Sequence, residues 1–178
     1  NGRTVMADAV VSNCDVQRTY RDLIGDDRGL STQKNIAKKY TPACSGLVLY
    51  LCLRGQYDHL AHHNFVFSSD SREEFGDNSD RGIPARDPTV YIAAPRRTDS
   101  GQAPMIDGEP GEALYLLIHT AYNREGPRWE NEGGLLESYR KVVFDKLARF
   151  GMEDLEERIV VERALTPDSI DRMYNAEG

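Results

Sequence analysis

YTPACSGLVLYLCLRGQYDHLAHHNFVFSS, residues 40–69, is the stretch around which we expect the rest of the chain to fold. Its run Gly46–Leu53 is the longest apolar segment in the chain, and Leu, Val, Tyr and Cys suit a buried strand. A second strand-like run, His62–Phe67, follows after a turn-like break at residues 54–58. Such strands need neighbours, so three more segments are predicted to complete a sheet: Thr89–Pro95, Ala113–Thr120 and Arg158–Leu165.

Alternation of side chains along a strand divides this predicted sheet into two different faces. One face is aliphatic and the other carries a tyrosine on each of three strands. We expect helices to cover the aliphatic face, whereas a large apolar ligand or another domain would suit the tyrosine face. Tyrosines that pack under loops, with hydroxyls bonded to the backbone, are the alternative. The aliphatic residues are Leu47, Leu49, Leu51, Leu53, Val90, Ile92, Ala94, Leu114, Leu116 and Ile118; those opposite include Val48, Tyr50, Cys52, Tyr91, Ala93, Tyr115, Leu117 and His119.

Apolar stripes and capping residues predict the helices. Leu135–Phe150 is the clearest, with Gly151 placed to end it. The others are Asp15–Ile24 (capped by Asn13 or Asp15 and ended by Gly25), Ser31–Lys39 (capped by Ser31) and a last helix that opens at Thr166-Pro167. Thr4–Ser12 is predicted as a strand after the turn-forming Asn1-Gly2. Loops are predicted at Ser69–Pro88, with a helical turn at Arg72–Phe75, at Arg96–Gly111 and at Asn123–Gly134, which holds Trp129. The fold class is therefore α+β.

Composition excludes several classes of function. The 178 residues suffice for one domain with a real core, and a formal charge of −7 argues against a nucleic-acid partner. No apolar run approaches the roughly 20 residues of a membrane helix. The cysteines Cys14, Cys44 and Cys52 are odd in number and lack metal spacing, which favours reduced thiols in a cytoplasmic protein.

Recognisable chemical motifs are missing from the sequence. Dinucleotide and phosphate cradles of the types GxGxxG and GxxxxGK[ST] are absent, as is GxSxG. His59, His62 and His63 form HxxHH, but His62 and His63 on a strand point to opposite faces, so no metal site is predicted. Acidic residues such as Glu109 and Glu112 are interpreted as solvated charge. No catalytic residues can be deduced from these patterns.

Six segments in order resemble the central part of the carotenoid (phytoene) desaturase family, flavoenzymes of the wider amine-oxidase-like group. The resemblance covers Ala7–Asn175, and HHNFVFSSD is most similar to bacterial desaturases of linear carotenoids. The segments are ADAVVSNCDVQRTYRDLI (7–24), KYTPACSGLVLYL (39–51), HLAHHNFVFSSD (59–70), DPTVYIAAPRRTD (87–99), EALYLLIHT (112–120) and IVVERALTPDSIDRMYN (159–175).

The resemblance implies a mainly antiparallel sheet with helices on one side and a substrate channel on the other. It also implies hydride removal from an allylic carbon, with FAD as acceptor. Residues 1–14 would be the edge of the crossover from an FAD domain, and residues 15–178 the substrate domain. Ser12, Asn13 and Asp15 would then lie near the flavin ring, with helix capping as their alternative role. The parts that hold FAD in the family are not among these 178 residues, so we expect no useful FAD affinity.

The channel implied by the resemblance corresponds to the tyrosine face, with Tyr50, Cys52, Tyr91, Ala93, Tyr115 and His119 as candidate substrate contacts. The implied partner is an apolar carotenoid, which admits peripheral membrane association. Three alternatives remain open: a carotenoid isomerase or oxidase relative, a non-enzymatic carrier of apolar ligands, and a metal-binding protein that uses HxxHH.

Overall fold

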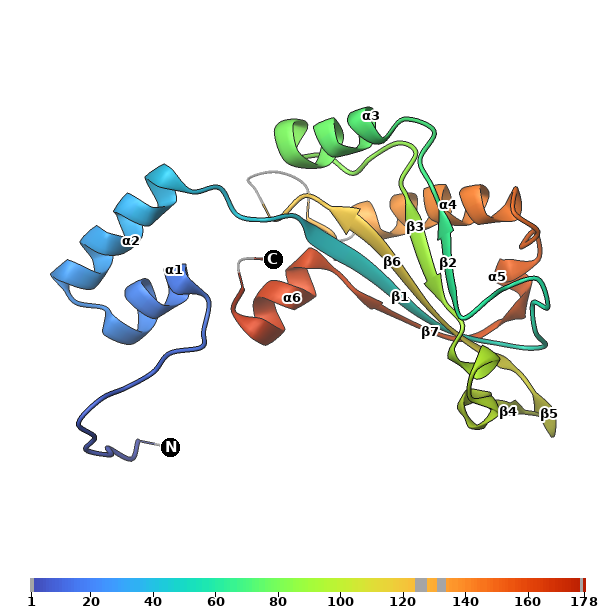
Figure 1. Cartoon of the computed structure of the whole chain (residues 1–178), viewed down its shortest axis with the longest axis horizontal. Coiled ribbons are helices and arrows are strands. Elements are labelled where there is room, and N and C mark those ends of the chain that lie inside the picture. The colour runs from blue at the N-terminus through green and yellow to red at the C-terminus, as the bar shows by residue number, and fades with distance from the viewer. Residues whose placement is uncertain (1, 124–127, 131–133, 177) are drawn as a thin grey trace.

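A computed structural model describes residues 2–123, 128–130, 134–176 and 178. Five antiparallel strands form one sheet in the order β2-β3-β6-β1-β7 (Figure 1). The strands are β1 (Ser45–Leu53), β2 (His63–Val66), β3 (Val90–Ala93), β6 (Glu112–Thr120) and β7 (Ile159–Leu165). Every predicted strand of the sheet is present within two residues of its expected ends, and the α+β class with an antiparallel sheet is confirmed.

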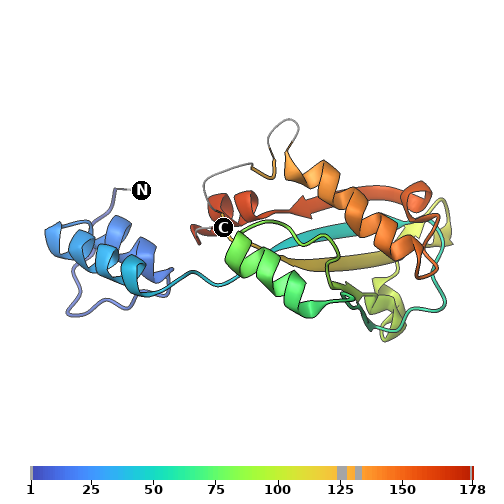
Figure 2. The same ribbon diagram turned by 90° about the horizontal axis from the view of Figure 1, so that it is seen from above.

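The aliphatic face is the core, as predicted. Helix α4 (Leu135–Ala148) runs alongside the strands in Figure 2, and its Leu147 is fully buried in one cluster with Leu49 of β1 and Leu116 of β6. Leu155, from the short helix α5 (Leu155–Arg158), joins the same cluster. Phe150, which was expected in the α4 stripe, lies beyond the helix end and is 52% exposed.

Two helices form an arm that projects from the sheet (Figure 1). Helix α1 (Val16–Arg18) continues as a π-helix over Thr19–Ile24, with Asp15 as its N-cap and Gly25 (φ 64°) at its end. Helix α2 (Asp27–Lys39) crosses this segment at Gly29, where a Cβ atom would lie 2.6 Å from the Tyr20 carbonyl oxygen. The arm is tied to the rest of the molecule by a hydrogen bond of 2.6 Å from the Arg18 guanidinium to the Asp171 carboxylate.

Three local predictions are wrong. Helix α2 begins four residues before the predicted Ser31, because the Asp26 carboxylate accepts from the Gly29 N–H and caps it. Residues 4–12 form no strand, since no segment that the structure describes pairs with them; Asn1 lies outside the described residues. The predicted loop at residues 96–111 contains a hairpin, β4 (Met105–Ile106) and β5 (Glu109–Pro110).

The remaining helices lie in the loops and at the end of the chain. Helix α3 (Ser71–Phe75) extends the expected turn and continues as a π-helix over Gly76–Arg81. Helix α6 (Pro167–Tyr174) opens as predicted at Thr166, which forms a reciprocal capping box with Ser169. The predicted loop at residues 123–134 lies in part outside the described residues, but its Trp129 is buried in the core. Among the described residues, no helix is long and apolar enough to span a membrane.

Candidate binding face

The tyrosine face is built by direct cross-strand pairing of β6 with β1 and with β3. Tyr50 lies opposite Tyr115, and Tyr115 lies opposite Ala93. The ring centroid of Tyr115 is 5.5 Å from that of Tyr50 and 6.1 Å from that of Tyr91. None of the three tyrosines belongs to the core cluster with α4, and Tyr50 is 46% exposed. The prediction that these tyrosines gather on the face away from α4 is confirmed.

A pocket of about 320 Å³ is hollowed into this face. Small side chains form depressions between larger ones, because Cys52 pairs with Ala113 on β6 and Ala93 pairs with Tyr115. The lining is Tyr50, Leu51, Cys52, Ala93, Pro95, Ala113, Leu114, Tyr115, Val161 and Arg163. Four of the six predicted substrate contacts therefore meet in one pocket, and an almost wholly apolar lining suits an apolar ligand.

The other two predicted contacts lie further along the same face. The ring of Tyr91 is tilted against that of Phe65 of β2, with centroids 5.0 Å apart, and the Tyr91 hydroxyl is 2.7 Å from His63 Nδ1. His119 lies near the opposite end of β6 and lines a second pocket. The structure thus places Tyr91 and His119 on the tyrosine face but outside the 320 Å³ pocket.

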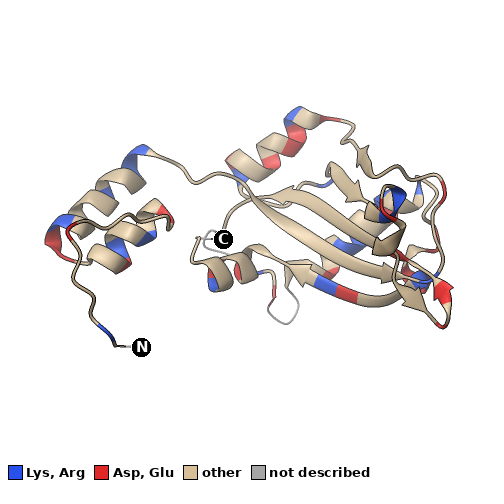
Figure 3. Ribbon diagram, turned by 60° about the horizontal axis from the view of Figure 1, so that its bottom comes forward, with Lys and Arg blue, Asp and Glu red and all other residues tan. Residues whose placement is uncertain are grey.

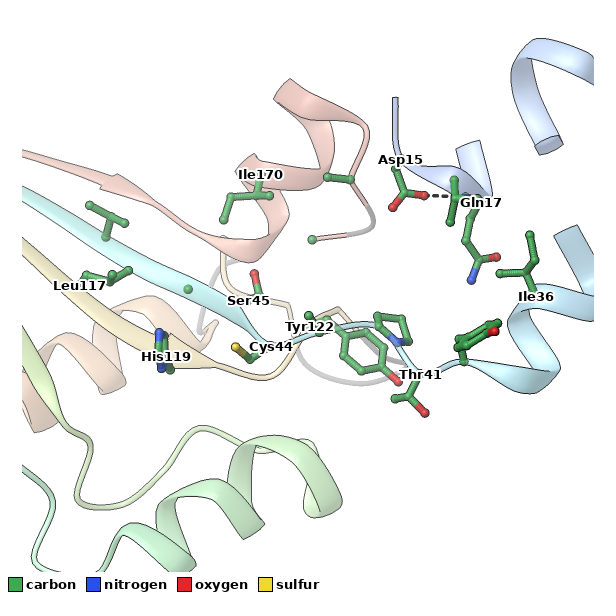
Figure 4. A pocket seen from close by; sticks show the side chains of 18 residues that line it. Asp15, Gln17, Ile36, Thr41, Cys44, Ser45, Leu117, His119, Tyr122 and Ile170 are labelled. Carbon is green, nitrogen blue, oxygen red and sulfur yellow. Dashed lines mark hydrogen bonds between the residues drawn. The ribbon is translucent and has the colours of Figure 1, made fainter. Parts of the chain in front are cut away.

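The second pocket, of about 570 Å³, lies where the arm meets the sheet (Figure 4). Its lining includes Asp15, the N-cap of α1, and Gln17 of α1. Thr41, between α2 and β1, and His119 of β6 also line it. Of the predicted flavin-side residues, Asp15 lines this pocket, whereas Ser12 and Asn13 do not. The Asp15 carboxylate accepts from the Gln17 and Arg18 N–H groups, and Ser12 Oγ is 2.7 Å from Thr19 Oγ1. The capping role of Asp15 is confirmed, and its position near a flavin stays a prediction.

Both pockets follow one continuous face of β1 and β6. We call the 570 Å³ pocket, where the arm meets the sheet, the junction pocket. It is lined by the cross-strand pairs Gly46–His119 and Val48–Leu117, and the 320 Å³ pocket by Tyr50–Tyr115 and Cys52–Ala113. Six residues separate Gly46 from Cys52, which corresponds to roughly 20 Å along a strand. We call this strip of four pairs the trough. Its length of roughly 20 Å suits a long linear molecule better than a compact one.

Several residues of this face were missed because alternation had been applied to only three strands. On β7, Val161 pairs with Cys52 and Arg163 pairs with Tyr50. On β2, Phe65 is 56% exposed and stacks on Phe67 with ring centroids 5.7 Å apart. The same rule, extended to Ile159–Leu165 and His63–Val66, could have found these residues, but the strand order that sets the neighbours could not be read from the sequence.

Burial affects one ionisable side chain on each face of the sheet, Tyr115 and Glu112. Burial, and secondarily the neighbouring Tyr50 and Tyr91, raise the pKa of Tyr115, so its hydroxyl stays protonated at neutral pH. By contrast, the predicted surface residue Glu112 is fully buried on the aliphatic side. Its carboxylate accepts from the Tyr57 N–H and from Arg96 Nε at 2.9 Å, so the interpretation as solvated charge is wrong for Glu112.

The histidines give no support for a metal site. His62 lies at a bend before β2, and its ring centroid is 4.2 Å from that of His63, so the two rings do not point to opposite faces as predicted. Nevertheless, no group of three His, Cys, Asp or Glu side chains among the described residues could hold a metal ion.

These residues do not by themselves fit FAD. A flavin dinucleotide is held through its pyrophosphate by a glycine-rich turn at a helix N-terminus, and no such turn occurs in the sequence. At the start of α1 the Asp15 carboxylate already occupies the first N–H groups, which leaves no phosphate cradle there. We therefore derive no catalytic step through a flavin from this chain.

The chain thus forms an antiparallel sheet that packs against helix α4 on its aliphatic face and carries the aromatic trough on the other. The chain is 36% identical over 176 residues to 4,4'-diaponeurosporene oxygenase of Staphylococcus haemolyticus, and 32% identical over 177 residues to that of Staphylococcus aureus. These alignments cover 99% and 98% of the chain but 33% of each relative, so the chain spans about a third of their length. No family model matches the chain. The chain is thus homologous to carotenoid-modifying enzymes, and the predicted resemblance to the carotenoid desaturase family is confirmed.

Proposed function

We propose that the tyrosine face binds a long, linear carotenoid-type polyene, as the substrate domain of an FAD-dependent carotenoid-modifying oxidoreductase. The observation that carries this proposal is the trough, in which two pockets follow the same face of β1 and β6. A hydrocarbon polyene offers no strong hydrogen-bonding group, so its affinity must come from burial of apolar area, at roughly 25 cal/mol per Å² before the entropic costs of binding.

The aromatic side chains suit such a ligand physically. Tyr115 lies edge-on to both Tyr50 and Tyr91, so the three rings form a rigid wall that loses little side-chain entropy on binding. Ala93, Ala113 and Cys52 leave space between the rings for a thin chain. In this proposal Tyr50, Cys52, Ala93 and Tyr115 contact the polyene directly, Tyr91 extends the wall, and His119 lies at the end of the trough that faces the arm.

The redox chemistry is assigned to a flavin held by parts of the protein outside this chain. We propose that residues 1–14 are the edge of an FAD domain and residues 15–178 the substrate domain, with Ser12, Asn13 and Asp15 towards the cofactor. When bound, FAD supplies a hydride acceptor, and the residues of this chain orient the polyene and exclude water. After incubation with FAD and desalting, the chain alone is expected to keep no flavin absorbance; a stoichiometric flavin band would contradict this assignment.

The family resemblance and the names of the relatives point to two different reaction classes. The resemblance implies desaturation, whereas the relatives are named oxygenases. Both reactions oxidise a polyene, and the trough suits either, so we propose oxidation of a linear carotenoid without choosing the bond. We further propose a cytoplasmic protein that associates peripherally with membranes. Phe65 and Phe67 are 56% and 69% exposed, and they offer an apolar contact to a membrane, in which apolar substrates dissolve.

A fluorescent linear polyene tests the proposal directly. Methyl cis-parinarate should increase its emission when titrated with the chain, because its tetraene enters an apolar pocket. Ala93→Phe and Cys52→Trp fill the 320 Å³ pocket and should weaken this binding at least tenfold. The exposed Met105→Phe is a control on the β4–β5 hairpin, outside both pockets.

The titrations of the pocket variants and one chimera distinguish a substrate domain of an enzyme from a simple carrier of apolar ligands. Unchanged binding by both pocket variants would show that the trough is not the site. If the wild-type chain binds the polyene, a chimera in which it replaces the matching third of 4,4'-diaponeurosporene oxygenase distinguishes an enzyme part from a simple carrier. Oxidised polyene, separated by chromatography, is expected from the enzyme part and not from a carrier.

A further inference from the structure

One side chain of the small pocket differs in kind from the others. Among the residues that line the 320 Å³ pocket, Arg163 alone is charged. It lies on β7 directly opposite Tyr50, and residues paired in this way share a face of the sheet. A guanidinium therefore stands at the edge of an apolar, aromatic surface. Figure 3 shows that charge is otherwise sparse along the strands and is concentrated on helices and loops.

Arg163 is also set apart by its partners. Its Nη1 donates to the Glu162 carbonyl oxygen at 2.9 Å, but no ion pair among the described residues includes it. The neighbouring carboxylate of Glu162 is bound by Arg140, with Nε–Oε1 and Nη2–Oε2 distances of 2.8 and 3.0 Å. The chain has 29 acidic and 22 basic residues, so carboxylates are not scarce. Arg163 nevertheless has no carboxylate partner among the described residues.

The chemistry of the side chain indicates its ligand. A guanidinium presents five donors in a plane and binds a carboxylate through two parallel hydrogen bonds. Because Arg163 is exposed on β7, water screens this attraction, which should have the modest strength of a surface ion pair. The relatives are named oxygenases. A terminal polyene carbon that gains oxygen becomes polar, and its full oxidation gives a carboxylate on an otherwise apolar chain.

We propose that Arg163 binds the carboxylate end of a polyene acid, with the hydrocarbon part lying over Tyr50 and Tyr115. This inference rests on the proposed function, because it assumes that the trough holds the polyene. It adds that the site is directional: the β7 edge receives an oxidised, anionic end, and the apolar strip of β1 and β6 receives the chain. Arg163 is thus a specificity-determining residue that selects among polyenes by their ends.

Two matched ligands isolate the charge. cis-Parinaric acid and its methyl ester carry the same linear tetraene and differ only in the terminal carboxylate. We expect the wild-type chain to bind the acid about fivefold more tightly than the ester, the gain typical of a partly exposed ion pair. The preference should shrink as salt is raised from 0.05 to 0.5 M, because the Debye length then falls roughly threefold, from about 14 to about 4 Å.

Variants then assign the preference to one side chain. Arg163→Gln should bring the acid to the affinity of the ester and leave the ester unchanged, and Arg163→Lys should keep part of the preference. Arg149→Gln is the matched control, because Arg149 is exposed, lines neither pocket of the trough and forms no ion pair with another described residue.

The outcomes separate this inference from the function on which it rests. Equal affinities of acid and ester in the wild-type chain, or an equal loss of both in Arg163→Gln, would overturn the role of Arg163 while leaving the trough intact. Failure of the wild-type chain to bind the ester at all would overturn the proposed function itself.

Discussion

The two faces of the sheet are made by the same strands but differ in almost every physical respect. On the aliphatic face, Leu49 and Leu116 are fully buried beneath α4. On the tyrosine face, Tyr50 is 46% and Phe65 56% exposed. One alternation of residues therefore produces a surface that stabilises the fold and a surface free to bind a ligand. Substitutions on the two faces should separate stability from binding.

Truncation on the aliphatic face should have the largest effect on stability. Leu49→Ala and Leu147→Ala each remove a fully buried side chain from the interface of β1 with α4 and should lower the free energy of unfolding by roughly 2–5 kcal/mol. Tyr50→Ala, one position from Leu49 on the same strand, should cost distinctly less. Urea unfolding monitored by circular dichroism measures all three, and equal losses would erase the distinction between the faces.

Enlarging a side chain should change stability less than truncation does, and again more on the aliphatic face than on the tyrosine face. Leu49→Phe overpacks the core and should cost roughly 1–3 kcal/mol, yet leave polyene binding by the folded protein intact. Ala93→Phe fills the pocket of the tyrosine face and should remain within about 0.5 kcal/mol of wild type. Paired melting curves and methyl parinarate titrations test the contrast. A strong loss of stability in Ala93→Phe would place that residue in the core.

The smallest expected effect is a pH-dependent contribution to stability from the ion pair between Asp87 and Lys146 of α4. The hydrogen bond from the nearly buried Lys146, together with the Ser69 N–H, lowers the pKa of Asp87 from 3.8 to about 2. A lowered pKa stabilises the folded state above pH 3.8, and this contribution is lost as the pH falls through about 2.

Because water screens the partly exposed Asp87, we expect this carboxylate to contribute about 1 kcal/mol at neutral pH. Asp87→Asn should therefore be less stable than wild type at pH 7, and the difference should narrow towards pH 2. The exposed Asp8→Asn is the control for removal of a negative charge. A difference that is independent of pH would show that the ion pair with Lys146 is not its source.

The sequence was most informative where periodicity and burial agree. Alternation in Gly46–Leu53 and Ala113–Thr120, and the apolar stripe of Leu135–Phe150, predicted the strands, the core helix and the gathering of the tyrosines. Thr4–Ser12 has strand-like composition but no partner in the described chain, and pairing is a non-local property that composition does not contain. The identity of the neighbours on β7, and hence the position of Arg163, depended on a strand order set only by the folded sheet.

Other errors came from local signals that were present but unused. Asp107-Gly108, with φ values of 54° and 88°, is the type of dipeptide that favours a tight hairpin and could have predicted β4 and β5. Asp26, three residues before Gly29, could have indicated the true start of α2. The burial of Glu112 had no such signal, because its partner Arg96 is distant along the strand connection and is brought close by the fold.

The three cysteines allow the most direct test of the central claim, that the tyrosine face is the ligand site and the arm's outer surface is not. Cys52 lines the small pocket, Cys44 lines the junction pocket, and the exposed Cys14 lines neither. The measurement is the rate of alkylation of each thiol by iodoacetamide, followed by mass spectrometry with and without saturating methyl parinarate. We predict that the ligand slows modification of Cys52 several-fold, slows that of Cys44 to a lesser degree, and leaves Cys14 unchanged. Undiminished modification of Cys52 in the saturated protein would contradict the assignment of the tyrosine face as the binding site.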